Sequence, residues 1–149
     1  MTFESKLIEE NQSHHIFPSS YVTEDACKIS EIYRNEINIL IWKRNLNNLL
    51  IKSSEIVLDD NPNLEYSEVL KPDEVKQSLE SVLGDNIKTS PFIEDVSYLS
   101  FMFCKLFDQK KLWLRLDGID HPMCPRFHTD KIKCRLVTTY VGPATQWLP

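Results

Sequence analysis

The spacing of apolar residues changes along the chain, from the period of a helix to that of a strand. Between residues 90 and 107 the apolar positions recur at intervals of four and three, which predicts an amphipathic helix. These positions are Phe92, Val96, Leu99, Phe103 and Leu106. Ser90 suits the cap of this helix and Pro91 its first position. Cys104 lies beside the apolar stripe, so we interpret it as a small core residue.

Three more segments have helical spacing. The first follows Thr23, a predicted N-cap, and the second is "NLNNLLIKSSEIVL" at residues 45–58. The third, "KPDEVKQSLESVLG" at residues 71–84, has a proline in its first turn and a glycine as its stop signal. Its apolar positions are Val75, Leu79, Val82 and Leu83. Between the first two, Ile37–Trp42 is a short apolar run that suits a buried strand, although a buried helical segment has the same pattern.

After residue 111 the pattern alternates, as in a β-strand. Leucines at 112, 114 and 116 alternate with Trp113, Arg115 and Asp117, and "CRLVTTYVG" at residues 134–142 is rich in β-branched and aromatic residues. Pro122 and Pro125 exclude a regular helix between these two predicted strands. We therefore expect a polar leader over residues 1–20 and a single α+β domain over 21–149. Residues 21–110 would be mainly helical, and 111–149 would form the β part.

Composition narrows the classes of partner. The 149 residues carry a net charge of −5, and the 17 Lys and Arg residues are scattered, which argues against nucleic-acid binding. No window approaches the roughly 20 apolar residues of a membrane span, and the first residues do not resemble a signal peptide, so a cytoplasmic location is expected. The four cysteines are then expected to be thiols. The three glycines form neither a phosphate loop nor a dinucleotide fingerprint.

Residues capable of binding metal gather in one short stretch. His121, Cys124, His128, Asp130 and Cys134 fall within fourteen positions. On an extended chain, residues two apart point to the same face, about 7 Å from one another, so His128 and Asp130 could occupy adjacent positions on one metal ion. A further, distant histidine would complete the two-His-one-carboxylate arrangement of Fe(II) sites.

Two other interpretations of this stretch stay open. Cys124 with His128 or Cys134 could bind zinc, although the spacing does not match that of paired Cys-x2-Cys sites. Alternatively, the stretch is an ordinary strand with a hydrogen-bonded histidine and two buried thiols.

Residues 112–149 resemble the central block of an uncharacterised bacterial domain-of-unknown-function family, whose members often occur beside zinc-homeostasis genes. The resemblance rests on "CPRFHTD" at 124–130, "RL" at 135–136, "TY" at 139–140 and "GPATQWL" at 142–148. The upstream "INILIWKRNL" at 37–46 is also similar to the family pattern. Ala144 and Gln146 depart from it, because the family usually has a glycine and an acidic residue there.

The family's His-x-Asp segment is similar to the metal-binding segment of Fe(II)/2-oxoglutarate oxygenases and other double-stranded β-helix proteins. This resemblance implies that His128 and Asp130 are metal ligands, with Fe(II) and 2-oxoglutarate, or zinc, as the cofactor. It also implies that Arg126 or Arg135 could hold a carboxylate in a bidentate pair, and that Tyr140 and Thr139 could line the pocket.

The implied barrel is incomplete in this chain. A closed β-helix of this type needs about eight strands, whereas the 38 residues from Leu112 to Pro149 suffice for three or four. No histidine follows His128. We therefore expect a helical part packed on a partial, truncated jelly-roll sheet, and three explanations compete. The chain is a fragment of a longer metal-dependent protein, or a second copy or partner chain completes its sheet, or it is a non-catalytic module that binds metal or protein. Catalysis by the chain alone is left open.

Overall fold

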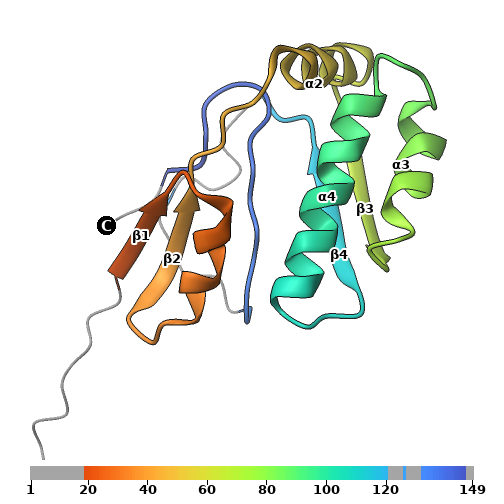
Figure 1. Cartoon of the computed structure of the whole chain (residues 1–149). Coiled ribbons are helices and arrows are strands. Elements are labelled where there is room, and N and C mark those ends of the chain that lie inside the picture. The colour runs from red at the N-terminus through yellow and green to blue at the C-terminus, as the bar shows by residue number, and fades with distance from the viewer. Residues whose placement is uncertain (1–18, 121–125, 127–131, 147–149) are drawn as a thin grey trace, which may run out of the picture. The chain divides into compact units, whose positions relative to one another are not determined.

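The computed structural model describes residues 19–120, 126 and 132–146. These residues form two compact units that divide between Asn45 and Leu46. Figure 1 shows that both units contain helices and strands, with a two-stranded sheet in each. The predicted α+β class is therefore confirmed, and each unit is described by itself.

The first unit is a parallel strand pair joined by a short helix. Strand β1 (Ser19–Thr23) pairs with β2 (Ile37–Trp42), and the 3-10 helix η1 (Ala26–Tyr33) connects them. The predicted strand at 37–42 is thus confirmed. Strand β1 begins inside the stretch predicted as leader and continues to Thr23, which was predicted as a helix cap.

The helix predicted after Thr23 is shorter and tighter than expected. Asp25 is its N-cap, and the Asp25 side chain accepts a hydrogen bond of 2.9 Å from the backbone N–H of Cys27. Thr23 caps the turn before it, because its hydroxyl oxygen accepts a 3.0 Å bond from the backbone N–H of Asp25. None of the η1 side chains is buried. The helix therefore lacks the apolar packing that usually supports a longer α-helix.

The second unit packs helices against one face of an antiparallel strand pair. Its elements are α2 (Asn48–Asp60), β3 (Glu65–Leu70), α3 (Val75–Leu83), α4 (Ser90–Leu106) and β4 (Leu112–Asp117). Strand β3 pairs with β4, from Glu65 opposite Asp117 to Leu70 opposite Leu112. Figure 1 shows α3 and α4 side by side in front of this pair. The three α-helices and β4 were all predicted.

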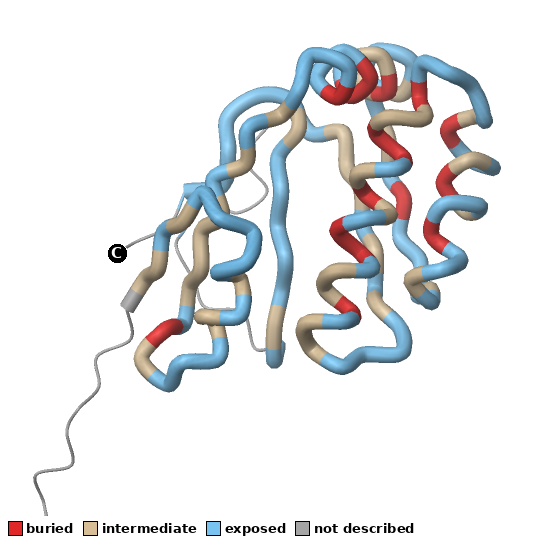
Figure 2. Tube along the Cα trace, in the orientation of Figure 1, coloured by how far each residue is buried: buried red, intermediate tan, exposed pale blue. Residues whose placement is uncertain are grey.

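The core of this unit lies between the helices and the inner face of the sheet. Val75, Leu79 and Ile93 are almost completely buried, with exposed fractions of 0%, 0% and 1%. Figure 2 shows the buried positions recurring along one side of α3 and α4. Leucines 112, 114 and 116 pack against this core, as their alternation predicts. Val82 is 48% exposed, although it was predicted as part of the same apolar set.

A serine of α2 forms hydrogen bonds with the backbone at the start of α4. The hydroxyl of the buried Ser53 donates a 2.6 Å hydrogen bond to the carbonyl oxygen of Lys88 and accepts a 3.1 Å bond from the backbone N–H of Phe92. Phe92 is in the first turn of α4, where backbone N–H groups have no partner within the helix. A side chain 39 residues away in sequence therefore satisfies one of them.

The sheet of the second unit differs from the expected arrangement in two ways. The partner of β4 is β3, whose sequence "EYSEVL" was not predicted as a strand. Residues 134–142, which were predicted as a strand, form no ladder within the described chain. High β-propensity marks a chain that suits a sheet, but a strand also needs a partner with which to pair. A jelly-roll sheet is not observed in the described residues, and this part of the expectation stays a prediction.

Candidate functional site

The C-terminal segment 132–146 is fastened to α4 by one tyrosine. The Tyr140 hydroxyl donates a 2.6 Å hydrogen bond to Oδ2 of Asp95. The ring of Tyr140 meets the ring of Phe92 edge to face, with the centroids 4.8 Å apart. A charged acceptor and an aromatic contact are each worth more than an average surface contact. This pair therefore sets where the segment after the predicted metal motif runs.

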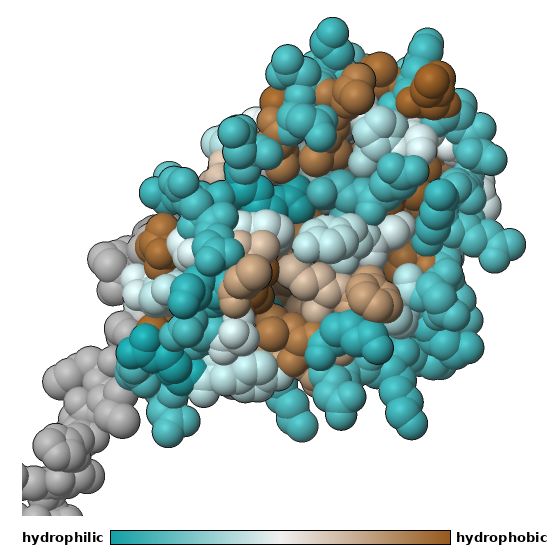
Figure 3. Space-filling model, in the orientation of Figure 1, coloured by the Kyte–Doolittle hydropathy of each residue, from teal (hydrophilic) through white to brown (hydrophobic). Residues whose placement is uncertain are grey.

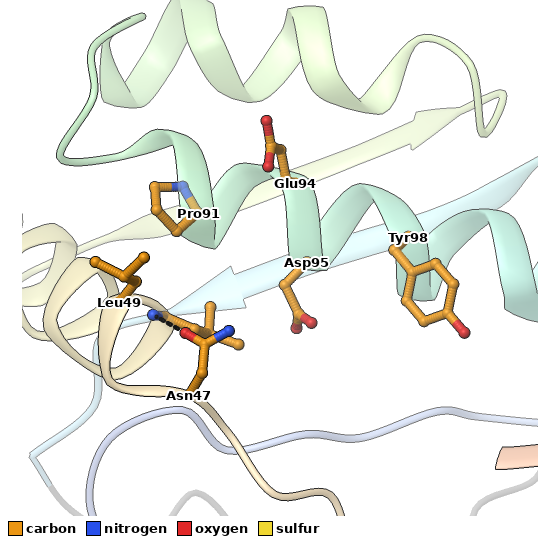
Figure 4. Close-up of a pocket in the computed structure, with 7 residues that line it drawn as sticks. Asn47, Leu49, Pro91, Glu94, Asp95 and Tyr98 are labelled. Carbon is orange, nitrogen blue, oxygen red and sulfur yellow. Dashed lines mark hydrogen bonds between the residues drawn. The ribbon is translucent and has the colours of Figure 1, made fainter.

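A shallow pocket opens beside this anchor, between the first turn of α2 and one face of α4. Its volume is about 320 Å³. It is lined by Asn47, Leu49, Leu50, Pro91, Glu94, Asp95 and Tyr98. Figure 4 shows the Asp95 and Tyr98 side chains on the same side of α4. The pocket thus combines carboxylates with an apolar wall. Leu49 contributes to that wall and is itself 72% exposed.

The two carboxylates of the pocket have different surroundings. Glu94 points away from Asp95 toward α3, as Figure 4 shows, and lies 3.9 Å from the ammonium of Lys76. It also accepts a 3.2 Å bond from the hydroxyl of Ser90. Asp95 instead binds Tyr140. On the side of the molecule drawn in Figure 3, apolar surface is also visible over α2. The pocket is therefore one polar corner of a partly apolar surface.

A second polar group joins β3 to α3. The Tyr66 and Ser78 hydroxyls lie 2.7 Å apart, and each is within hydrogen-bond distance of Oε2 of Glu68, at 3.2 and 2.9 Å. Burial raises the pKa of Tyr66, the negative charge of Glu68 raises it further, and the bond with Ser78 opposes this shift. The phenol is protonated at neutral pH and can therefore donate a hydrogen bond between β3 and α3, and the raised pKa extends this to more alkaline solution. Its role is structural.

The residues predicted for the metal site have different outcomes. His121, Cys124, His128 and Asp130 lie outside the described residues, so the His-x-Asp site stays a prediction. In the ranges that are described, no three His, Cys, Asp or Glu side chains gather in a metal-binding arrangement.

The remaining predicted site residues are described. Arg126 and Arg135 are exposed, as is Thr139. Cys134 is half-buried, and it is a thiol, as are Cys27 and Cys104. Tyr140 is half-buried next to the pocket, although it is not one of the residues that line it. Its acceptor Asp95 was missed, because α4 was read as a purely structural helix.

Comparison with known proteins identifies the family. A family model described as "Protein of unknown function (DUF1826)" matches residues 23–149. The chain belongs to the DUF1826 family. The DUF1826 match begins at Thr23, the last residue of β1, and covers η1, β2 and the whole helical unit. No curated protein and no solved structure matches the chain.

The described helices also bear on the predicted absence of a membrane span. Not one of them is both long enough and apolar enough to cross a bilayer. The longest, α4, has seventeen residues. It carries Glu94, Asp95 and Lys105 along its length.

Proposed function

We propose that this DUF1826 chain binds a divalent metal ion through His128 and Asp130. The observation that carries the proposal is the spacing of these two residues. An imidazole and a carboxylate two positions apart reach the same side of an extended chain, where both can contact one ion. The described anchor supports it, because Tyr140 binds α4 only ten residues after Asp130. A segment fixed at one end loses less conformational freedom when it binds an ion.

The chemistry of the neighbouring residues separates two kinds of metal site. In the first, His121 or a more distant histidine joins the pair and Fe(II) is bound, which leaves coordination positions open for a 2-oxo acid. The guanidinium group of Arg126 or Arg135 would then pair with the carboxylate of that acid. Both arginines are exposed, which is compatible with contact to a small anion. In this form the chain would be part of a metal-dependent oxygenase.

In the second kind of site, thiolates complete the coordination and the chain is a zinc-binding, non-catalytic module. Cys134 favours this alternative, because it is a half-buried thiol four positions after Asp130. Zinc prefers sulfur and nitrogen ligands in a closed tetrahedron, which leaves no position for a substrate. Cys124 is the natural second sulfur ligand. Such a module would serve metal homeostasis or hold a protein partner.

Metal content is the decisive measurement for the proposal. Protein purified without chelator is analysed by elemental mass spectrometry, together with His128→Ala and Asp130→Ala. Asp85→Ala is the matched control, because it removes a carboxylate elsewhere in the chain, whereas every histidine of the chain is a candidate ligand. We expect metal in the wild type and the control, and at least about a tenfold lower content in the two site variants. Equal metal content in all four proteins would contradict the proposal.

Cobalt substitution distinguishes the two kinds of site. A Co(II) sample with sulfur ligands absorbs in the near ultraviolet through thiolate-to-metal charge transfer, whereas a site with only nitrogen and oxygen ligands does not. Loss of this band in Cys124→Ser and Cys134→Ser would establish the zinc module. Absence of the band in the wild type, together with calorimetric binding of 2-oxoglutarate to the Fe(II) form, would establish the oxygenase-like site.

A further inference from the structure

Residues 136–141, "LVTTYV", have the composition of a strand but form no ladder in the structure. Four of the six are β-branched, one is aromatic and none is charged. The apolar side chains stand in solvent, with Leu136 40%, Val137 58% and Val141 38% exposed. We call residues 135–141 the C-terminal segment core. A short, uncharged, β-prone stretch of this kind readily pairs with another strand.

We propose that the C-terminal segment cores of two copies of this chain pair as antiparallel strands centred on Thr138, which makes the protein a two-fold symmetric dimer. The tyrosine anchor is compatible with this pairing. Tyr140 binds Asp95 through its hydroxyl and Phe92 through its ring. An anchor made by a side chain does not use the backbone N–H and C=O groups that form a ladder. The segment can therefore remain on α4 while it pairs.

When the segment pairs with a second copy of itself, the distribution of charge favours the antiparallel direction. The segment begins with two basic residues, Lys133 and Arg135, and has no charge from there to residue 146. Parallel pairing in register would place Arg135 beside Arg135 and Lys133 beside Lys133, and such like-charge pairs are destabilising. Antiparallel pairing moves these charges to opposite ends, with Arg135 opposite Val141. Pro143 has no backbone N–H and so ends the ladder soon afterwards.

The register follows from the faces of the strand. In an antiparallel pair related by a two-fold axis, opposite residues point to the same face, so the axis must pass through a residue position. An axis at Thr138 places Leu136 opposite Tyr140 and Val137 opposite Thr139. Thr138 lies opposite its own copy. These are aromatic–aliphatic and β-branched pairs, which stabilise a sheet. The identical sequence of the two strands therefore supplies its own complementary partner.

The mass of the protein in solution tests the proposal. Light scattering after size exclusion is run over about a hundredfold range of protein concentration, because a dimer dissociates on dilution. We expect twice the chain mass of 17.5 kDa at the highest concentration. Thr138→Lys places two ammonium groups opposite each other and should raise the dissociation constant at least about tenfold. Thr145→Lys adds the same charge at an exposed position outside the segment core and should leave it unchanged.

A mixture of charge variants separates loss of pairing from loss of folding. Thr138→Asp alone should also be monomeric, whereas an equal mixture of Thr138→Lys and Thr138→Asp should recover the dimer, because opposite charges now face each other. Three results would overturn the proposal: a wild-type protein that is monomeric at every concentration, a Thr138→Lys variant that dimerises as the wild type does, or a mixture that stays monomeric. An open series of larger assemblies would overturn it as well, since a two-fold pair closes on itself.

Discussion

The hydroxyl of Tyr140 donates a 2.6 Å hydrogen bond to the carboxylate of Asp95, which lies 45 positions earlier in the sequence. This bond and the ring contact with Phe92 join the C-terminal segment to α4, the longest of the described helices. The contact is therefore the place at which the segment's contribution to stability can be measured.

Removing only the hydroxyl of this tyrosine should weaken the fold measurably. Tyr140→Phe keeps the ring contact with Phe92 and loses the bond to Asp95, so we expect the free energy of unfolding to fall by about 1–2 kcal/mol in urea titrations. Tyr98→Phe is the matched control, because Tyr98 lies on α4 beside the same pocket and is 52% exposed. Equal losses in the two variants would mean that the Tyr140 bond has no special weight.

Stability should fall in alkaline solution because of Tyr66. Burial raises the pKa of its phenol in the folded state, so the folded chain holds this proton more tightly than the unfolded chain. Above the ordinary tyrosine pKa of about 10, the unfolded state binds fewer protons, and the free energy of unfolding decreases as pH rises. In denaturant titrations from neutral pH to above about pH 10, the free energy of unfolding of Tyr66→Phe should decrease less than that of the wild type.

Two features make the alkaline comparison specific. Burial also raises the pKa of the Cys104 thiol, so this thiol lowers stability in alkaline solution as well. Because Cys104 is present in both the wild type and Tyr66→Phe, its contribution cancels when the two proteins are compared. Tyr98→Phe, which removes the hydroxyl of a tyrosine that is 52% exposed, is the matched variant to be measured beside it. A Tyr66→Phe curve parallel to that of the wild type would show that Tyr66 does not cause the decrease.

A glycine after α4 should stabilise the chain. Asp108 has a positive φ of 48°, and the next residue, Gln109, donates a 2.8 Å backbone bond to the carbonyl of Cys104. Glycine adopts this left-handed conformation without the steric cost of a side chain, and residue 108 also follows the C-terminal end of α4, where the helix dipole disfavours a negative charge. We expect Asp108→Gly to raise the free energy of unfolding by about 0.5–1 kcal/mol.

The opposite sign is expected for a glycine inside a helix. Glu55 is exposed in the middle of α2, and Glu55→Gly should lower the free energy of unfolding by about 1 kcal/mol. If both substitutions destabilise the chain in the same thermal or urea experiment, the left-handed position of residue 108 does not determine its preference.

Two apolar residues of α3 should differ sharply when they are shortened. Leu79→Ala removes a side chain with 0% exposure and should cost about 2–5 kcal/mol, because it leaves a cavity among Val75, Ile93 and their neighbours. Val82→Ala shortens a side chain that is 48% exposed, and its effect should stay within about 0.5 kcal/mol. Urea titration of the two variants measures the difference, and comparable losses would contradict the burial pattern of this helix.

Val82 also shows why the core could be predicted only in part. Helical spacing places it beside Leu79 and Leu83 in an apolar group, but spacing alone does not say how wide the covered stripe is. The neighbours α4, β3 and β4 decide this, and they leave Val82 in solvent. By contrast, the leucines of β4 alternate with exposed residues, so their orientation could be predicted before their partner was known.

The strands that were missed lack the pattern on which the prediction relied. Strand β3 contains Glu65 and Glu68 and has only Tyr66 buried, so its pairing with β4 is visible only in the folded chain. Residues 134–142 show the reverse case, a strong β composition without a ladder. Of the candidate site, Tyr140 was predicted to line the pocket of the metal site, and this stays a prediction. Its bond to Asp95 was not predicted, because Asp95 belongs to no recognisable motif. These two residues are 45 positions apart and meet only in the folded chain, so local sequence patterns do not predict their contact.

The bridge from Ser53 to Phe92 has a consequence for any attempt to study α4 as a peptide. The N–H group of Phe92 is satisfied by a hydroxyl on another helix, and the carbonyl of Lys88 accepts from that same hydroxyl. A synthetic segment 88–108 would contain every residue of α4 but not this hydroxyl, so its first turn would fray and its helicity would depend on its distal half. The position at which α4 begins therefore depends on a residue of α2.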